Sequence, residues 1–280
     1  MPSRFVEPRD INVWLSDDRS GNRPLPVVYI NDLEQLPDRE GPWHDASGPD
    51  GHIAALAAAA LSWPAIVVGI GCSSTSLRDF APGAPLALCA AGLRGQVEIA
   101  LGGPALSDAY LRFIVEELKP AIDASFPTAP GRRHTFIAGA DMAGLASVYA
   151  LTSYPQVFGG AASFSTERVL VPPEIARAPD HVSWSRNLER GIARYLARTL
   201  PLARSHRLYI DYSDATLDGL SGPLRSAVER IALAKGYARH RDFESLPLTR
   251  DDRSEQGRCE RAAVAARLLL KADFERAETD

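Results

Sequence analysis

The 280-residue sequence is poor in cysteine and has no excess of basic residues. Its three cysteines, Cys72, Cys89 and Cys259, are far apart and odd in number. They therefore offer neither the paired spacing of a zinc site nor a disulfide framework. We expect a reducing compartment, the cytoplasm, and assign no metal or other cofactor. The formal net charge of −4 argues against a nucleic-acid partner, because such a partner usually needs a basic face.

Long apolar runs are also missing. Residues 1–10 are charged and do not resemble a secretory signal peptide. The apolar run at residues 52–61 is too short and too rich in alanine to cross a membrane, so we expect no membrane partner. Repeats and low-complexity linkers are absent as well. With 45% apolar and 24% charged residues, the chain has the composition of a soluble globular protein, and we expect one domain over residues 1–280.

Short apolar segments alternate with helical segments along the chain. Residues 26–30 and 65–70 are almost continuously apolar, which is typical of strands covered on both faces. The alternation predicts an α/β fold with a mostly parallel central sheet and helices on both faces. The expected strands are 11–15, 26–30, 65–70, 134–138, 160–164, 207–212 and 239–246; the expected helices are 52–62, 107–124, 141–152, 187–199, 224–235 and 258–274.

Three stretches have no regular pattern. Residues 38–51 and 71–95 are predicted to be long, irregular loops. Residues 167–185, rich in proline and arginine, are the best candidate for a cap or lid above the sheet, within an insertion over 166–200. Pro120 falls inside the expected helix 107–124 and should bend or split it.

One strand–turn–helix segment, residues 134–149, has an unusual turn. It reads Gly139-Ala-Asp-Met-Ala143 in the context where α/β-hydrolases carry the Gly-x-Ser-x-Gly nucleophile elbow. Asp141 occupies the serine position, and Ala143 occupies the position of the final glycine. The segment therefore predicts a hydrolase fold, while its central residue argues against ordinary hydrolysis.

Further segments match one family of that fold. They are 26–32 (PVVYIND), 65–70 (AIVVGI), 78–82 (RDFAP), 113–123 (FIVEELKPAID), 137–146 (IAGADMAGLA), 154–159 (YPQVFG) and 208–212 (LYIDY). The chain resembles the esterase family that contains esterase D (S-formylglutathione hydrolase), the enterochelin esterases and the feruloyl-esterase-like proteins. This resemblance extends over most of the sequence. It implies an α/β-hydrolase fold and, in the family, ester hydrolysis by a serine, a histidine and an acid.

The resemblance also gives the positions of the other two triad residues. The acid is expected just after the strand that ends near Tyr212, at Asp218 or, as second choice, at Asp214. The position of the family's histidine falls on Arg253, and Arg258 stands where a tryptophan is expected. Serine and histidine are thus both replaced.

The oxyanion hole of this fold uses two backbone N–H groups. Here they belong to Met142, directly after the nucleophile position, and to Leu33, in the loop after an early strand. Asp32 precedes Leu33, and relatives tend to have glycine after this aspartate, at the position of Leu33. We take Asp32 and Arg258 as candidates for contacts with a bound ligand.

Asp141 has three interpretations. As a nucleophile it would form a covalent ester intermediate, which only an activated water could hydrolyse. As a structural residue it would suit a strained turn, because aspartate tolerates positive φ, and its carboxylate would be favoured at a helix N-terminus. As a partner of Arg253 it would replace the serine–histidine hydrogen bond by an ion pair. The second and third interpretations are compatible.

No histidine occupies the expected position. His134, His206 and His240 precede or begin predicted strands, and therefore lie at the edge opposite the one where catalytic groups gather, roughly 20 Å away. The other three, in loops or at helix starts, are His44, His52 and His181. Of these, His181 in the candidate cap is the best substitute base.

Arginines recur in two further places. Arg186, Arg190, Arg194 and Arg198 are spaced by four residues, as on a solvated helix face. Residues 250–261 contain four arginines interleaved with acids, which fits either a solvated helix start or an anion site near the cleft; they are Arg250, Arg253, Arg258 and Arg261.

These observations favour a catalytically impaired esterase-like protein that binds an unknown small molecule or partner protein in the former active-site cleft. The alternative is a carboxylic-ester hydrolase that works through a non-standard site with Asp141 in the nucleophile position. A scaffold or homo-oligomer subunit without a ligand is a third class, and no sequence feature favours it.

Overall fold

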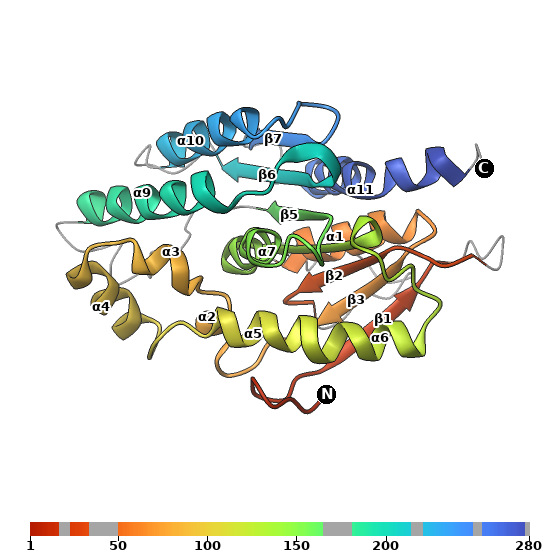
Figure 1. Ribbon diagram of the computed structural model, residues 1–280, viewed down its shortest axis with the longest axis horizontal. Helices are drawn as coiled ribbons and strands as arrows, with labels where there is room; N and C mark the ends of the chain where they lie inside the picture. The colour runs from red at the N-terminus through yellow and green to blue at the C-terminus, as the bar shows by residue number, and fades with distance from the viewer. Residues whose placement is uncertain (17–22, 34–49, 165–180, 214–220, 249–253, 278–280) are drawn as a thin grey trace.

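The computed structural model describes residues 1–16, 23–33, 50–164, 181–213, 221–248 and 254–277 (Figure 1). Its centre is a seven-stranded sheet in the order β1-β3-β2-β4-β5-β6-β7. Only β1 is antiparallel to its neighbour, so the predicted mostly parallel sheet is confirmed. The strands are β1 (Ile11–Leu15), β2 (Val27–Asn31), β3 (Ile66–Ile70), β4 (Thr135–Ala140), β5 (Gly160–Phe164), β6 (Arg207–Ser213) and β7 (Phe243–Leu248).

The central strands are apolar on both sides because helices cover both faces of the sheet. Along β2, Tyr29 packs into one hydrophobic cluster, and its neighbours Val28 and Ile30 pack into the other. One face carries α1 (Asp50–Leu61) and α11 (Glu255–Ala277), which lie against each other. The edge strand β1 is only half-buried along its length, as its alternating sequence predicted.

The opposite face carries further helices (Figure 1). Five of them are α5 (Ser107–Phe113), α6 (Lys119–Ser125), α7 (Asp141–Ser153), α9 (His181–Thr199) and α10 (Ser221–Ala234). Two single turns, η3 (Arg132–His134) and η5 (Ala203–Ser205), precede β4 and β6. Within the described ranges, no helix is both long enough and apolar enough to span a bilayer.

The helix expected around Pro120 is interrupted where the sequence predicted. A π-helical segment, η2 (Ile114–Leu118), joins α5 to α6, and Pro120 lies in the first turn of α6. Proline has no N–H and its ring clashes with the carbonyl one turn earlier. A wider π turn just before it accommodates both defects.

Several boundaries predicted from the sequence are wrong. Residues 71–95 are not one irregular stretch: they contain α2 (Ser76–Asp79), α3 (Gly83–Ala87) and the start of α4 (Ala91–Ala100). The Gly and Pro residues that suggested a loop separate these short helices, and buried side chains such as Leu86 hold them on the core. The last strand begins at Phe243 rather than 239, because His240, at φ 62°, lies in a turn before it.

Helix α9 begins before the expected residue 187 and packs into the main helical layer. It buries Leu188, Ile192 and Leu196 in the same hydrophobic cluster as the sheet, and it contacts α3 and α10. The part of the predicted cap that remains is residues 166–180, and these lie outside the described residues.

Glu189 on α9 is half-buried, and this burial raises the pKa of its carboxyl group to about 7, although Arg186 opposes the shift. A pKa that is higher in the folded than in the unfolded chain means that stability is lost as pH rises from about 4.5 to about 7. We expect Glu189→Gln to raise the free energy of unfolding at pH 8 by up to about 1 kcal/mol, a value reduced for solvent screening, and to have little effect at pH 4. Urea unfolding at the two pH values measures this, with Glu260→Gln, at an exposed position of α11, as the control; equal changes at both pH values would contradict it.

Candidate active site

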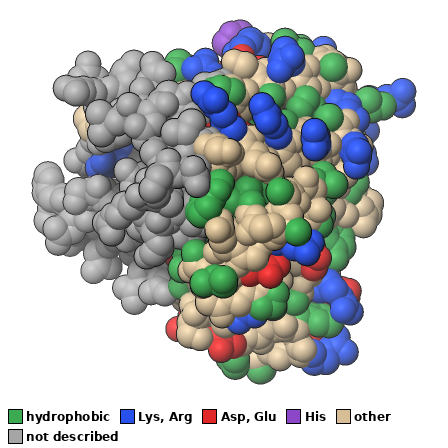
Figure 2. All heavy atoms as spheres, turned by 90° about the vertical axis from the view of Figure 1, so that its left-hand side faces the viewer, with side chains coloured by type: hydrophobic (Ala, Val, Ile, Leu, Met, Phe, Trp, Pro, Cys, Tyr) green, Lys and Arg blue, Asp and Glu red, His purple; other side chains and the backbone are tan. Residues whose placement is uncertain are grey.

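The carboxyl ends of β3, β2 and β4 lie side by side at one edge of the sheet. Open α/β folds bind their ligands at this edge. The strands β2, β5 and β6 point to the left of Figure 1, and Figure 2 shows the molecule from that side. Asp32 follows β2, Cys72 follows β3 and Asp141 follows β4. The sheet order thus brings together three reactive side chains from distant parts of the chain.

The turn between β4 and α7 has the geometry of a nucleophile elbow. Asp141 begins α7 with φ 49°, a left-handed conformation that few residues other than glycine, asparagine and aspartate adopt. A Cβ on Gly139 would lie 2.5 Å from the carbonyl carbon of Ala143, and one on Gly144 would lie 2.5 Å from Ser163 Oγ. Strand and helix therefore touch, and Gly139 and Gly144 permit this contact although the last elbow glycine is replaced by alanine.

The carboxylate of Asp141 stands at the N-terminus of a 13-residue helix. The helix macrodipole and its unpaired backbone N–H groups favour an anion at this end. Asp141 is half-buried, so it lies in the wall of the site rather than in the core. This position agrees with the structural interpretation and also with a carboxylate presented to a ligand.

A buried polar network holds the first turn of α7 from behind. Asn31, at the end of β2, donates from Nδ2 to Ser147 Oγ (2.9 Å) and to the backbone oxygen of Ala143 (3.4 Å). The hydroxyl of Tyr110, on α5, donates to Asn31 Oδ1 at 2.7 Å, and burial raises the pKa of this tyrosine well above its usual value. Because Asn31, Ser147 and Tyr110 are all buried, the elbow is fixed by side chains outside the triad. We predicted no role for these residues from the sequence.

The backbone N–H groups of the predicted oxyanion loop are already hydrogen-bonded within the protein. Asp32 has φ 64°, a left-handed conformation that aspartate tolerates better than most residues other than glycine. The backbone N–H groups of Asp32 and Leu33 both donate to the carbonyl of Ile70, at 2.9 and 3.3 Å. An oxyanion would have to compete with that carbonyl for Leu33, so the role of Leu33 stays a prediction. Met142, the other predicted donor, is half-buried next to Asp141.

A thiol that sequence reasoning treated as incidental lies in the site. Cys72 Sγ donates to Asp32 Oδ1 at 2.5 Å, and both residues are half-buried. The carboxylate that we took as a ligand contact is therefore already engaged. The missed signal is the position of Cys72 only two residues beyond the end of β3. Within the described part of the chain, no three His, Cys, Asp or Glu side chains are grouped so that they could hold a metal ion.

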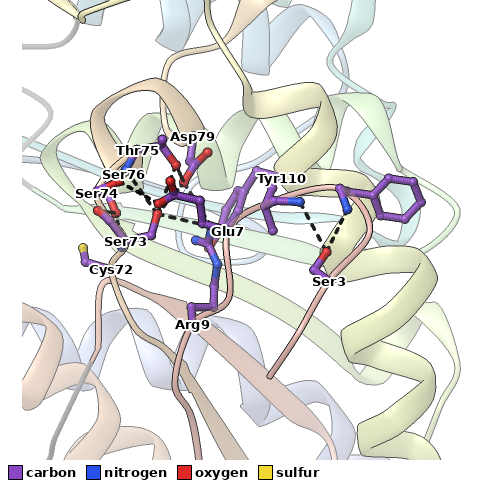
Figure 3. A network of polar contacts seen from close by, with 12 residues as sticks. Ser3, Glu7, Arg9, Cys72, Ser73, Ser74, Thr75, Ser76, Asp79 and Tyr110 are labelled. Atoms are coloured by element: carbon purple, nitrogen blue, oxygen red, sulfur yellow. Dashed lines mark hydrogen bonds and ion pairs between the residues drawn. The ribbon is translucent and has the colours of Figure 1, made fainter.

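The loop that carries Cys72 is anchored by a buried ion pair (Figure 3). Arg9 Nη2 lies 3.0 Å from Asp79 Oδ2, and both side chains are inaccessible to solvent. The same oxygen accepts hydrogen bonds from Ser73 Oγ (3.1 Å) and Thr75 Oγ1 (3.0 Å). The guanidinium of Arg9 also stacks 4.9 Å from the ring centre of Tyr110. The N-terminal segment therefore reaches the same buried network that supports the elbow.

The structure gives Arg261 neither of the two roles that the sequence suggested for the arginines of residues 250–261. It is 5% exposed, and its Nη1 lies 3.0 Å from Asp211 Oδ2 on β6. Tyr209 donates to the same oxygen at 3.0 Å. Arg261 is therefore part of the core, neither solvated nor available to an anion. Arg258, the predicted ligand contact, is half-buried, and its backbone N–H bonds to Ser254 at the start of α11.

Three predicted residues lie outside the described residues. They are Arg253 at the histidine position and Asp214 and Asp218 at the acid position. The pair of Asp141 with Arg253 and the choice between the two acids therefore stay predictions.

The histidines with described side chains all lie at the other edge of the sheet, as expected. His134 is in η3, just before β4. His206 is buried before β6, with its ring nitrogens 3.1 Å from the backbone oxygen of Leu202 and 2.9 Å from that of Pro155. His240 precedes β7, with Nδ1 2.9 Å from Glu244 Oε1. None of these three can act as a base at Asp141. The side chains of His44, His52 and His181 are outside the described set.

Comparison with known proteins agrees with this geometry. The family model described as "Putative esterase" matches residues 3–197. A search of curated protein sequences gave no match.

Similar solved structures share the fold at low identity. A ferulic acid esterase has a TM-score of 0.56 at 15% identity, over 96% of this chain and 94% of the other. An IroE-like serine hydrolase from Shewanella oneidensis has 0.57 at 16%, over 96% and 78%. The enterochelin esterase of Shigella flexneri has 0.55 at 14%, over 95% of this chain but only 55% of that enzyme. The fold, the elbow and the family match lead to one conclusion: this chain belongs to the "Putative esterase" family of α/β-hydrolases.

Proposed function

We propose that this protein has lost ester hydrolysis and binds a small molecule or a partner protein in the former active-site cleft. The observation that carries the proposal is the geometry of Asp141, a carboxylate at φ 49° at the start of α7, where the family presents its serine. The backbone of the elbow is kept, while the group that it presents is changed.

Two chemical arguments support the loss of turnover. A carboxylate that attacks an ester carbonyl forms an anhydride intermediate. An activated water is then needed to hydrolyse this intermediate. The three histidines with described side chains, His134, His206 and His240, are at the far edge of the sheet. A negative group beside the expected oxyanion site also disfavours the negative charge that develops on a carbonyl oxygen.

The alternative function is ester hydrolysis through Asp141 with a base other than these histidines. It is favoured by one observation, the strained conformation of Asp141, because strained backbone is often retained at reactive positions. Other members of the fold use an aspartate as nucleophile in this place. The same assay distinguishes the two functions.

We expect the purified protein to hydrolyse p-nitrophenyl acetate no faster than its Asp141→Ala variant. The double variant Asp141→Ser with Arg253→His should gain at least about tenfold over the wild type, because a positioned general base contributes about 10² to 10⁴ in rate. Release of p-nitrophenol under steady-state conditions measures both rates. Asp141→Ser alone is the control, since it restores the nucleophile without the base.

Wild-type turnover that disappears in Asp141→Ala would overturn the proposal and favour the alternative. If the double variant gains nothing while remaining folded by circular dichroism, the residues that support the triad have changed as well.

A further inference from the structure

Helix α9 exposes an arginine on each successive turn. The other face of α9 is buried against the core, so the face with the arginines is turned toward solvent. Four residues of α-helix advance about 6 Å, so the row is about 18 Å long. We call this row the arginine ridge; its members are Arg186, Arg190, Arg194 and Arg198. Figure 2 shows blue side chains gathered on the upper part of the face that it views.

Arginines on three other helices are paired with an acid of the same helical segment. Arg94 pairs with Glu98 and Arg112 with Glu116, each four residues away, and Arg225 pairs with Glu229 in the same way. No described carboxylate lies within 4.0 Å of a ridge guanidinium. The pairing seen at Arg94, Arg112 and Arg225 is therefore missing along the ridge.

The one acid of α9 does little to offset the ridge. Glu189 is half-buried and its pKa is raised to about 7 by burial, so at neutral pH it carries about half a charge. The whole chain has a net charge of −4, so the ridge is a local basic feature on an acidic protein. Four like charges in a row repel one another and destabilise the helix slightly, which an oppositely charged partner would reverse.

We propose that the arginine ridge binds an acidic helix of a partner protein, one with a carboxylate on each successive turn. Guanidinium groups bind carboxylates through two parallel hydrogen bonds, and the turn repeat of a second helix matches the spacing of the ridge. This surface lies on the outer side of α9 and does not depend on the function proposed for the cleft.

Two other anionic partners fit the surface less well. Single-stranded nucleic acid usually stacks its bases on exposed aromatic rings, whereas Trp184 and Tyr195 on α9 are half-buried and the Tyr195 hydroxyl accepts a hydrogen bond from Thr152. A lipid surface usually also receives apolar side chains, and among the side chains that the structure describes no large exposed hydrophobic residue lies within α9.

Two peptides of identical composition test the proposal. In the first, glutamates are placed four residues apart so that they form one stripe on a helix; in the second, the same glutamates are distributed around the helix. We expect the full-length protein to bind the striped peptide about tenfold more tightly in fluorescence anisotropy at low salt, with the preference decreasing as salt rises. Arg190→Gln with Arg194→Gln should remove that preference.

The matched control is Arg94→Gln with Arg112→Gln, which removes two exposed arginines from other helices and should leave binding unchanged. Arg190→Lys with Arg194→Lys keeps the charge without the paired hydrogen bonds and should retain part of the preference. Thermal unfolding verifies that every variant is folded.

The proposal is overturned if the two peptides bind equally, or if the ridge variant binds the striped peptide as the wild type does. It is also overturned if an oligo-dT strand or a phosphatidylserine vesicle binds more tightly than the striped peptide and loses this binding in the ridge variant. Those outcomes would assign the ridge to nucleic acid or to a membrane surface.

Discussion

Replacing Arg261 by methionine is expected to lower the free energy of unfolding by about 3–5 kcal/mol. The side chain of Asp211 is fully buried and accepts hydrogen bonds from Arg261 and Tyr209. Without the guanidinium, the carboxylate must either remain charged in the core or take up a proton at neutral pH, and both are costly. Urea unfolding at pH 7 measures the loss.

A compensating variant separates this charge effect from lost packing. Asp211→Asn with Arg261→Met keeps an acceptor for the Tyr209 hydroxyl but removes both charges. We expect it to recover at least half of the stability that Arg261→Met loses, because a neutral amide is far less costly to bury. A loss below about 1 kcal/mol in the single variant, or no recovery in the double variant, would show that the ion pair does not stabilise the core as described.

Gly139→Ala is expected to destabilise the protein by about 3 kcal/mol, the upper end for an overpacked site. The added Cβ would lie 2.5 and 2.6 Å from the carbonyl carbon and oxygen of Ala143, which are backbone atoms of α7. The helix can yield only by moving its first turn away from β4. Chemical denaturation of the wild type and the variant measures the change.

The same substitution elsewhere is the control. Gly95 lies inside α4 and has no atom within 4 Å of an added Cβ, so Gly95→Ala should stabilise the protein by about 0.5–1 kcal/mol through helix propensity. If both variants change stability in the same direction and by similar amounts, the close approach of β4 and α7 is not the reason that Gly139 is glycine.

Much of the fold follows from local patterns in the sequence. The short apolar segments located β1 to β6, and the parallel arrangement followed from the alternation of strands with helices. Pro120 predicted an interruption because its effect on a helix is local. The short helices in residues 71–95 escaped prediction because contacts with the core, rather than propensity, hold residues such as Leu86 in place.

The sequence predicted the site only where a motif determines the backbone conformation. The positive φ of Asp141 follows from the elbow, whereas that of Asp32 had no signal in the motif. The contacts of Tyr110 with Asn31 and of Cys72 with Asp32 join residues far apart in the sequence, so no spacing reveals them. Arg261 was misjudged for the same reason, since its partner is on another strand.

The network of Asn31, Tyr110 and Ser147 has a consequence for substitutions at position 141. It fixes the first turn of α7 through buried side chains that belong to other positions. The backbone at position 141 has φ 49°, so a replacement must also accept this angle. A side chain that meets this condition can change the chemistry of the elbow while the network still holds the helix in place.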